Sequence, residues 1–409
     1  MVGTVSKPDT HQKLEILSAD AQYDLACACG TKQDEGRRRG ADGRWIYPVT
    51  LPNGGRSVLF KTLVSNACTN DCKYCPLREE RDIRRCTLGP EETARVFLDY
   101  HRQRKVFGLF LSSGVVGSPD ATMDRLTTTA RLLRRKHGFR GYIHLKVIPG
   151  ASPAAIEEAV SLASAVSLNI ETPGQVHLAH LSTKKNYLRD IIEPIKLISR
   201  LTARGGRFAK VKQTTQFIVG AAGESDAEIV RYMGGLYDRL HMHRVYFSVY
   251  QKGMGDASLP AERFGADGEG VPPLRLVGIP SASSGQALPA MNEQGQDALA
   301  TPFMREHRLY QVDFLLRKYG FKDTDIVFGA RGELSLDTDP KEVWAHNHPE
   351  FFPVDVNRAT KTALLRVPGL GPLTVGQIVQ ARRAGRIGRL EDIGPAGVRL
   401  RKAASYLAF

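Results

Sequence analysis

The sequence predicts an α/β fold in which parallel strands alternate with helices and form a partial (βα)6 TIM-like barrel. Between Val58 and Tyr250, short runs rich in β-branched and aromatic residues alternate regularly with helix-like stretches. Such alternation favours parallel strand pairing with helices packed outside. Six strands of this kind make an open version of the β/α barrel, whose active sites gather where strands end.

Each element has its own local signal. The expected helices begin at signals such as Ser152-Pro153, or Ser225 followed by Glu228 three residues later. The expected strands are residues 58–65, 107–112, 141–148, 166–171, 212–219 and 244–250. The expected helices between them are residues 90–105, 121–137, 153–163, 188–204 and 225–240.

The length of 409 residues predicts two or three domains with ample core. Residues 253–301 are rich in Gly, Pro, Ser and Ala without a sustained period, which predicts a flexible loop or insertion. Helical periodicity resumes at Pro302–Tyr319. We therefore expect an N-terminal extension, the barrel, this loop, a helical connecting region and a C-terminal domain, at residues 1–55, 56–252, 253–301, 302–353 and 354–409.

The charge is uneven and strongly positive. The net charge is +14 and the isoelectric point is near 9.5, which indicates a polyanionic partner, with nucleic acid first and an anionic membrane surface second. From Val354 to the end, ten basic residues stand against three acidic ones, so +7 falls in the last 56 residues. A second basic cluster, in a Gly-rich stretch, consists of Lys32, Arg37, Arg38 and Arg39.

The chain has no segment typical of export or of a membrane span. No N-terminal stretch combines basic residues, an apolar core and a cleavage site, and the longest apolar runs are too short to cross a bilayer. Six cysteines in a chain of this length do not indicate a small disulfide-stapled domain. We therefore expect a cytoplasmic protein with reduced thiols.

Three cysteines lie on a short loop directly after the first expected strand, in the order Cys68-Thr-Asn-Asp-Cys72-Lys-Tyr-Cys75. Thiolates are the ligands of iron–sulfur clusters. Three of them leave one iron of a 4Fe–4S cube open to a substrate or cofactor. The alternative is a zinc site, completed by Cys68 and one of Cys27, Cys29, Cys86 or His101. Otherwise Cys27, Cys29 and Cys86 are expected to be buried free thiols rather than a second cluster.

The C-terminal segment contains an apolar helix end, a Gly-Leu-Gly turn and a second helix that begins near Pro372. Glycines at 369 and 371 allow positive φ, and free amides at a helix N-terminus form a site for a phosphate. This resembles the helix-hairpin-helix DNA-binding motif, with a second, degenerate copy at residues 390–403. The expected contact residues are Gly369, Leu370, Gly371, Thr374, Arg382, Arg383 and Arg386. The alternative is an αα-hairpin that only packs against the barrel.

The C-x3-C-x2-C spacing with Tyr74 before the last cysteine resembles the radical S-adenosylmethionine (SAM) superfamily. The resemblance implies a radical SAM type of barrel. It also implies that the open iron binds SAM and that one electron from the cluster releases a 5′-deoxyadenosyl radical. It further implies SAM contacts from Tyr74, Ser112, Ser113, Gly114, Asn169, Glu171, Gln216, Val219 and Gly220. The Ser112–Gly114 stretch departs from the superfamily's frequent Gly-Gly-Glu because it has no acidic residue.

Taken together, the cluster motif and the C-terminal hairpins resemble radical SAM proteins of DNA modification or repair with a C-terminal helix-hairpin-helix domain. The resemblance covers nearly everything except residues 253–301. It implies action on a nucleotide in DNA, an electron donor such as flavodoxin or ferredoxin, and a uracil-DNA-glycosylase-like partner. A radical SAM enzyme that modifies tRNA or other RNA and a non-catalytic DNA-binding iron–sulfur protein are the alternatives. No acid–base pair or nucleophile stands out at the strand ends, although Lys146 is either a substrate contact or a core-edge lysine.

Overall fold

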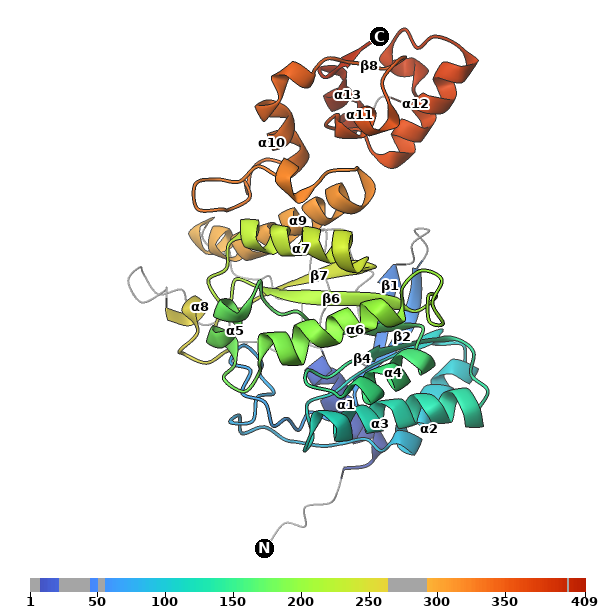
Figure 1. Ribbon diagram of the computed structural model, residues 1–409, viewed down its shortest axis with the longest axis vertical. Helices are drawn as coiled ribbons and strands as arrows, with labels where there is room; N and C mark the ends of the chain where they lie inside the picture. Colours follow the sequence, from blue (N-terminus) through green and yellow to red (C-terminus); the bar gives the residue numbers. More distant parts are fainter. Residues whose placement is uncertain (1–7, 22–44, 51–55, 264–292, 396) are drawn as a thin grey trace, which may run out of the picture. The chain divides into compact units, whose positions relative to one another are not determined.

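The computed structural model describes residues 8–21, 45–50, 56–263, 293–395 and 397–409 (Figure 1). Its residues fall into two compact units. The first unit comprises the described residues within 1–224 and 240–296, and the second those within 225–239 and 297–409. Cys27, Cys29, the basic cluster at residues 32–39 and most of the predicted 253–301 loop lie outside the described residues.

The first unit contains a curled seven-stranded sheet whose strands follow one another in chain order. The six predicted parallel strands are confirmed as β2 to β7. The sheet consists of β1 (Ile46–Thr50), β2 (Arg56–Leu63), β3 (Gly108–Ser112), β4 (Tyr142–Lys146), β5 (Ala165–Ser167), β6 (Lys212–Val219) and β7 (Arg244–Val249). The sequence did not predict β1, which pairs antiparallel to β2. Pro48 obscured it, because a proline is tolerated at a sheet edge but not within a sheet.

Four helices pack side by side outside the sheet, α2 against α3, α3 against α4 and α4 against α6 (Figure 1). They are α2 (Pro90–Arg102), α3 (Pro119–Arg131), α4 (Pro153–Leu162) and α6 (Glu193–Leu201). Ser118 and Ser152 cap α3 and α4, and each is followed by proline in the first turn. Short π-helical segments at Leu132–Lys136 and Tyr187–Ile192 adjoin α3 and α6. Phe60 of β2 contacts Phe97 of α2, which places the helices against the apolar side of the strands.

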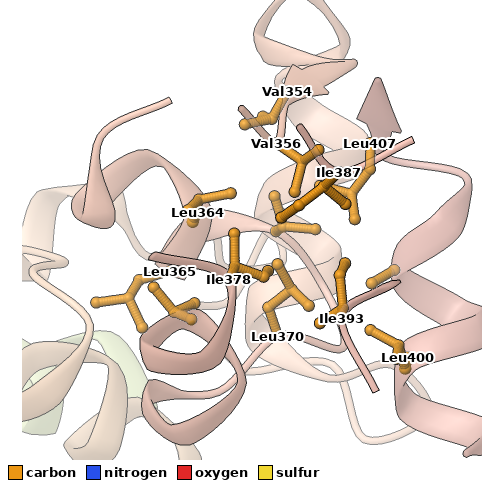
Figure 2. Packing of buried hydrophobic residues seen from close by; sticks show 13 residues of the cluster. Val354, Val356, Leu364, Leu365, Leu370, Ile378, Ile387, Ile393, Leu400 and Leu407 are labelled. Carbon is orange, nitrogen blue, oxygen red and sulfur yellow. The ribbon is translucent and has the colours of Figure 1, made fainter. Parts of the chain in front are cut away.

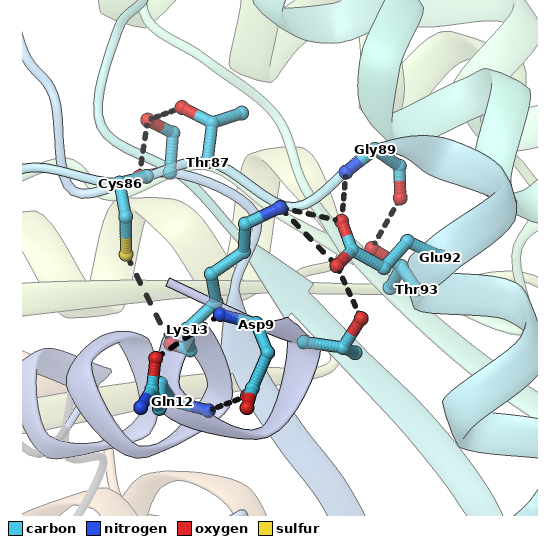
Figure 3. Close-up of polar contacts among 10 residues, drawn as sticks. Asp9, Gln12, Lys13, Cys86, Thr87, Gly89, Glu92 and Thr93 are labelled. Atoms are coloured by element: carbon cyan, nitrogen blue, oxygen red, sulfur yellow. Dashed lines mark hydrogen bonds and ion pairs between the residues drawn. The ribbon is translucent and has the colours of Figure 1, made fainter. Parts of the chain in front are cut away.

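The N-terminal helix α1 (Thr10–Asp20) was not predicted from the sequence. Cys86 packs against this helix (Figure 3). Asp9 and Gln12 form a capping box at its start. Lys13 pairs with Glu92 of α2 at 3.0 Å, and the Cys86 thiol lies 4.0 Å from the Lys13 carbonyl oxygen. Cys86 is therefore a half-buried free thiol against α1.

The second unit combines helix α7 (Asp226–Leu240) with the C-terminal part of the chain. Buried Asp226 accepts hydrogen bonds from Arg305 Nε at 2.6 Å and from the Leu334 amide at 2.9 Å. Helix α9 (Glu293–Lys318) begins earlier than the predicted Pro302, because Gly295 in its first turn hid the helical pattern. The unit continues with the short helix α10 (Pro340–Asn347). None of the described helices is long and apolar enough to cross a membrane.

The last 56 residues of the second unit surround a small apolar core (Figure 2). Figure 2 labels Leu364, Leu370, Ile378 and Leu400 within it. Its elements are β8 (Val354–Asp355), α11 (Lys361–Arg366), α12 (Pro372–Ala384), α13 (Val398–Ala404) and β9 (Leu407–Ala408). The parallel pairing of β8 with β9 joins the two ends of this segment.

Candidate active site at the strand ends

The cysteine loop follows β2 and is fastened to the end of β3. The Gly114 amide donates to the Ser65 carbonyl at 2.7 Å, and the Thr69 amide donates to the Val115 carbonyl at 2.9 Å. A Cβ on Gly114 would lie 2.3 Å from the Ala67 carbonyl oxygen. Packing alone therefore explains the glycine at position 114, a predicted SAM contact, since only glycine lets these two loops approach so closely.

The three thiols of this loop lie near enough to influence one another. The amides of Asn70 and Val115 each lie 3.4 Å from Cys68 Sγ and donate to it. Burial, reinforced by the neighbouring Cys72 thiol, raises the pKa of Cys75 to about 12, and burial also raises the pKa of Cys72. A metal that binds these sulfurs must therefore displace their protons.

The described residues offer no ready site for a single ion. Thiolates that share one zinc ion all lie about 2.3 Å from it, yet no group of three or more His, Cys, Asp or Glu side chains in the described ranges is placed to hold one ion. A 4Fe–4S cube is larger, so its ligands stand farther apart. The candidate zinc ligand His101 bonds the Val106 carbonyl at 3.0 Å and packs on Phe97 and Phe139.

Glu171 lies beside the cysteine loop in a strained conformation. Its φ is +66°, in the left-handed region that costs energy for a non-glycine residue. Its amide donates to Gln216 of β6 at 3.1 Å, and its buried side chain contacts the Tyr74 hydroxyl. The carboxylate oxygen Oε2 is buried and has no hydrogen-bond partner within the described part of the chain. An orphaned acceptor here fits a cofactor with donors, such as the amine or ribose hydroxyls of SAM.

Two charged residues that the sequence did not single out complete this site. The ammonium of Lys185 lies 3.8 Å from Glu171 Oε1 and interacts electrostatically with the nearby Cys72 sulfur. Asp71, between the cysteines, accepts hydrogen bonds from Ser182 and Thr183. Partial burial alone would raise the pKa of Asp71, but these donors outweigh it and lower the pKa to about 2.

Arg85 also holds the cysteine loop, and the sequence did not single it out either. Its guanidinium donates to the carbonyl oxygens of Leu77 and Arg78, both at 2.8 Å, and of Arg81 at 2.9 Å. These contacts fix the turn that follows Cys75. The partners lie next to the cysteines in sequence, but a pattern of charges does not distinguish such an arginine from a solvated one.

The other predicted SAM residues lie on β3 and β6 or directly after β3, β5 and β6. Ser112 and Gln216 are buried, Ser113 and Asn169 are half-buried, and Val219 is fully buried. The Gly220 amide donates to the Glu224 carboxylate, and so does the Ala222 amide, at 3.1 Å. The stretch after β6 is therefore folded around Glu224. Lys146 is half-buried at the end of β4, opposite Ser167.

In the second unit, the predicted nucleic-acid residues lie at both ends of α12. Gly369 has φ +86°, and a Cβ there would lie 2.2 Å from the Arg399 carbonyl oxygen. Gly371 has φ −113°, so the expectation of positive φ at this glycine is wrong. The Leu370 side chain is buried in the C-terminal core, which leaves only its backbone for an outside ligand. Thr374 is half-buried in the first turn of α12.

The three predicted arginines at the other end of α12 differ in their surroundings. Arg382 donates to the Ala359 carbonyl at 2.7 Å and so braces the segment before α11. Arg383 and Arg386 are exposed and have no ion-pair partner in the regions that the structure describes. Only these two of the three are thus available to an anionic ligand.

Residues 62–234 match the family model of the radical SAM superfamily. The chain therefore contains a radical SAM domain, which is an enzyme domain. It uses a 4Fe–4S cluster and S-adenosylmethionine as cofactors. No curated protein matches the chain in sequence.

Solved structures with some similarity include three radical SAM proteins. The [FeFe]-hydrogenase maturase HydG from Carboxydothermus hydrogenoformans is 16% identical with a TM-score of 0.39, over 48% of this chain and 46% of HydG. Methylornithine synthase (PylB) is 16% identical with a TM-score of 0.39, over 50% and 56% of the two chains. The methyltransferase TsrM from Kitasatospora setae is 17% identical with a TM-score of 0.35, over 46% and 35%. This chain thus spans about half of these proteins or less.

Proposed function

We propose that this radical SAM enzyme acts on a nucleotide within DNA, in modification or repair, and that its C-terminal segment is a helix-hairpin-helix domain that holds the DNA. The observation that carries this proposal is the set of exposed cations on the C-terminal segment. Lys361, Arg383 and Arg386 are exposed and have no ion-pair partner among the residues described. Solvated cations of this kind release phosphate counterions when they bind nucleic acid.

The dimensions of α12 favour a polymer over a single nucleotide. The helix has 13 residues and is therefore about 20 Å long. Its amide-bearing N-terminus follows Gly371, whereas Arg383 lies in its last turn. A ligand that meets both ends must carry several phosphates. Contacts to backbone phosphates carry no base information, so this segment would position the enzyme on DNA without choosing a sequence.

The strand-end site would supply the chemistry. With the cluster held by the three cysteines and SAM bound at its open iron, the two cofactors would supply a 5′-deoxyadenosyl radical by reductive cleavage of SAM. Cys68, Cys72 and Cys75 would hold the cluster, while Tyr74 and Glu171 would orient SAM at the edge of the site. A base in duplex DNA would have to flip out of its stack to reach this site. A low-potential donor such as flavodoxin or ferredoxin and a uracil-DNA-glycosylase-like protein are the proposed partners.

Substrate competition under anaerobic, reducing conditions tests the proposal. The reconstituted enzyme is offered deuterium-labelled duplex DNA, single-stranded DNA and tRNA. We expect tighter binding to DNA and transfer of deuterium from DNA into 5′-deoxyadenosine. Preferential binding and labelling from tRNA would replace the DNA assignment with RNA modification. Failure to bind any of the three would reject a nucleic-acid substrate altogether.

A further inference from the structure

Lys185 places a buried positive charge against a cysteine of the cluster loop. Its side chain is only 7% exposed, and that of Glu171, its nearest carboxylate, is 4% exposed. The Lys185 ammonium lies 3.8 Å from Glu171 Oε1 and near enough to the Cys72 sulfur to interact with it electrostatically. Burying an ammonium is strongly unfavourable unless it is well paired. The distance to Glu171 is long for a hydrogen bond, and the Cys72 sulfur is the other polar group that interacts with this ammonium most strongly.

The loop that carries Lys185 is tied to the cysteine loop at several points. The Thr183 amide and hydroxyl donate to Asp71 Oδ2 at 2.7 Å and 2.6 Å, and the Ser182 hydroxyl donates to the other carboxylate oxygen. The Lys73 amide donates to the Leu181 carbonyl at 2.8 Å. Lys184 Nζ donates to the Thr69 carbonyl at 2.8 Å. These bonds leave Lys185 little freedom to move away from Cys72.

A fixed cation at this position acts on electron uptake. Adding an electron to an iron–sulfur cluster makes the cluster more negative, and a nearby cation stabilises that charge, more strongly in a buried site than in water. Hydrogen bonds to the cluster sulfurs and the local net charge are among the properties that set reduction potentials. Glu171 has the opposite effect because its charge opposes electron uptake.

We propose that Lys185 raises the reduction potential of the cluster through the Cys72 sulfur, and that Asp71 is the positioning residue that holds Lys185 there. The pair of Lys185 and Glu171 then sets the potential by opposed charges at one edge of the site. This role is independent of the nucleic-acid substrate, because every residue in it belongs to the first unit.

The test is an EPR-monitored redox titration of the reconstituted enzyme, with iron and sulfide content measured on the same samples. Lys185→Met should shift the midpoint potential to more negative values, whereas Lys185→Arg should keep it close to wild type. Thr183→Val, which removes one tether to Asp71 without changing any charge, should give a smaller shift of the same sign. Lys196→Met is the charge-matched control, since the Lys196 side chain on α6 is 44% exposed and pairs with Glu193, and the potential of this variant should not change.

Glu171→Gln provides the test of opposite sign, because removal of the carboxylate charge should move the potential to more positive values. If Lys185→Met fails to assemble a cluster, Glu171→Gln becomes the deciding variant. The proposal is then overturned if the potential of Glu171→Gln does not shift to more positive values. Each titration is run without and with SAM. A Lys185→Met enzyme with full iron content that titrates like wild type without SAM overturns the proposal, even if a shift appears once SAM is added.

Discussion

At the scale of single residues, the absence of a side chain at Gly114 is as important as the presence of three thiols. This glycine packs directly on the backbone that leads into Cys68. Two loops that meet at backbone distance determine where the first cysteine stands, and a methyl group between them would push that cysteine out of place. The cluster site is therefore built from close backbone packing as well as from its ligands.

We expect Gly114→Ala to lower both stability and cluster occupancy. The new Cβ would lie 2.3 Å from the Ala67 carbonyl oxygen, so the backbone must move. Overpacking of this kind costs about 1–3 kcal/mol. Thermal unfolding and iron content after reconstitution measure the two effects. Gly89→Ala is the control, because its φ is −72° and nothing lies within 4 Å of the added atom. Equal behaviour of the two variants would contradict this account.

The three cysteine ligands can be tested separately from the other thiols. Cys68→Ala, Cys72→Ala and Cys75→Ala should each abolish the cluster, because the only other thiol among the described residues, Cys86, lies against α1. Cys86→Ala should retain about four irons and four sulfides per chain, since Cys86 lies against α1. Cys27→Ala and Cys29→Ala are expected to retain them as well. Metal and sulfide analysis of anaerobically purified protein decides, and stoichiometric zinc in place of iron would contradict the cluster.

Lys341 in the second unit predicts a pH dependence of stability. Its ammonium donates to the Leu370 carbonyl at 2.6 Å, and burial, partly opposed by Asp339, lowers its pKa to about 7. Between this value and the usual range near 10.4, the unfolded chain binds a proton that the folded chain does not. Stability should therefore rise with pH in this window, by at most about 1.4 kcal/mol per pH unit.

Lys341→Met should remove this rise. Denaturant unfolding followed from pH 7 to pH 9.5 compares the two proteins, and Lys361→Met, an exposed lysine on α11, is the control. Parallel slopes for Lys341→Met and wild type would show that Lys341 keeps an ordinary pKa.

At the scale of secondary-structure elements, the alternation of strands and helices could be predicted from the sequence. Contacts between residues far apart in the sequence could not. Each parallel strand is marked by a short apolar run, and helices α3 and α4 are marked by a capping serine. The sequence therefore predicted these strands and helices. Helices α1 and α5 (Gln175–Leu181) were missed. The role of Asp71 was also missed, because its partners lie more than a hundred residues away and depend on how the strand ends meet. Cysteine spacing, by contrast, is local, which is why the cluster could be predicted.

The turn before α12 separates two glycines that the sequence treats alike. Gly369→Ala should strongly destabilise the C-terminal segment, because a Cβ would collide with the Arg399 backbone at 2.2 Å and φ is +86°. Gly371→Ala should be nearly neutral, because its φ is −113° and its nearest neighbour is the Tyr319 hydroxyl at 3.5 Å. Thermal unfolding of both alanine variants compares the two positions directly.

At the scale of the whole molecule, the composition gives the net charge, but it does not show which basic side chains can bind an anionic ligand. Several cations of the C-terminal segment already have partners: Arg366 pairs with Asp325 and Lys402 with Glu342. These contacts also show that residues 354–409 are bound to the preceding helical region, so deleting them would expose more than a binding surface. Substitution of individual exposed arginines is therefore the cleaner experiment.

The double variant Arg383→Gln, Arg386→Gln should weaken DNA binding to a similar degree on unrelated sequences, since phosphate contacts carry no base information. For each phosphate that the variant no longer binds, the slope of log affinity against log salt should fall by about 1. Arg358→Gln is the matched control, because Arg358 is exposed but lies near Asp355, and it should change the slope less. Both variants should still cleave SAM in the absence of DNA, because the cysteine loop belongs to the other unit. An unchanged slope in the double variant would mean that α12 is a packing element and that nucleic acid, if bound, contacts a different surface.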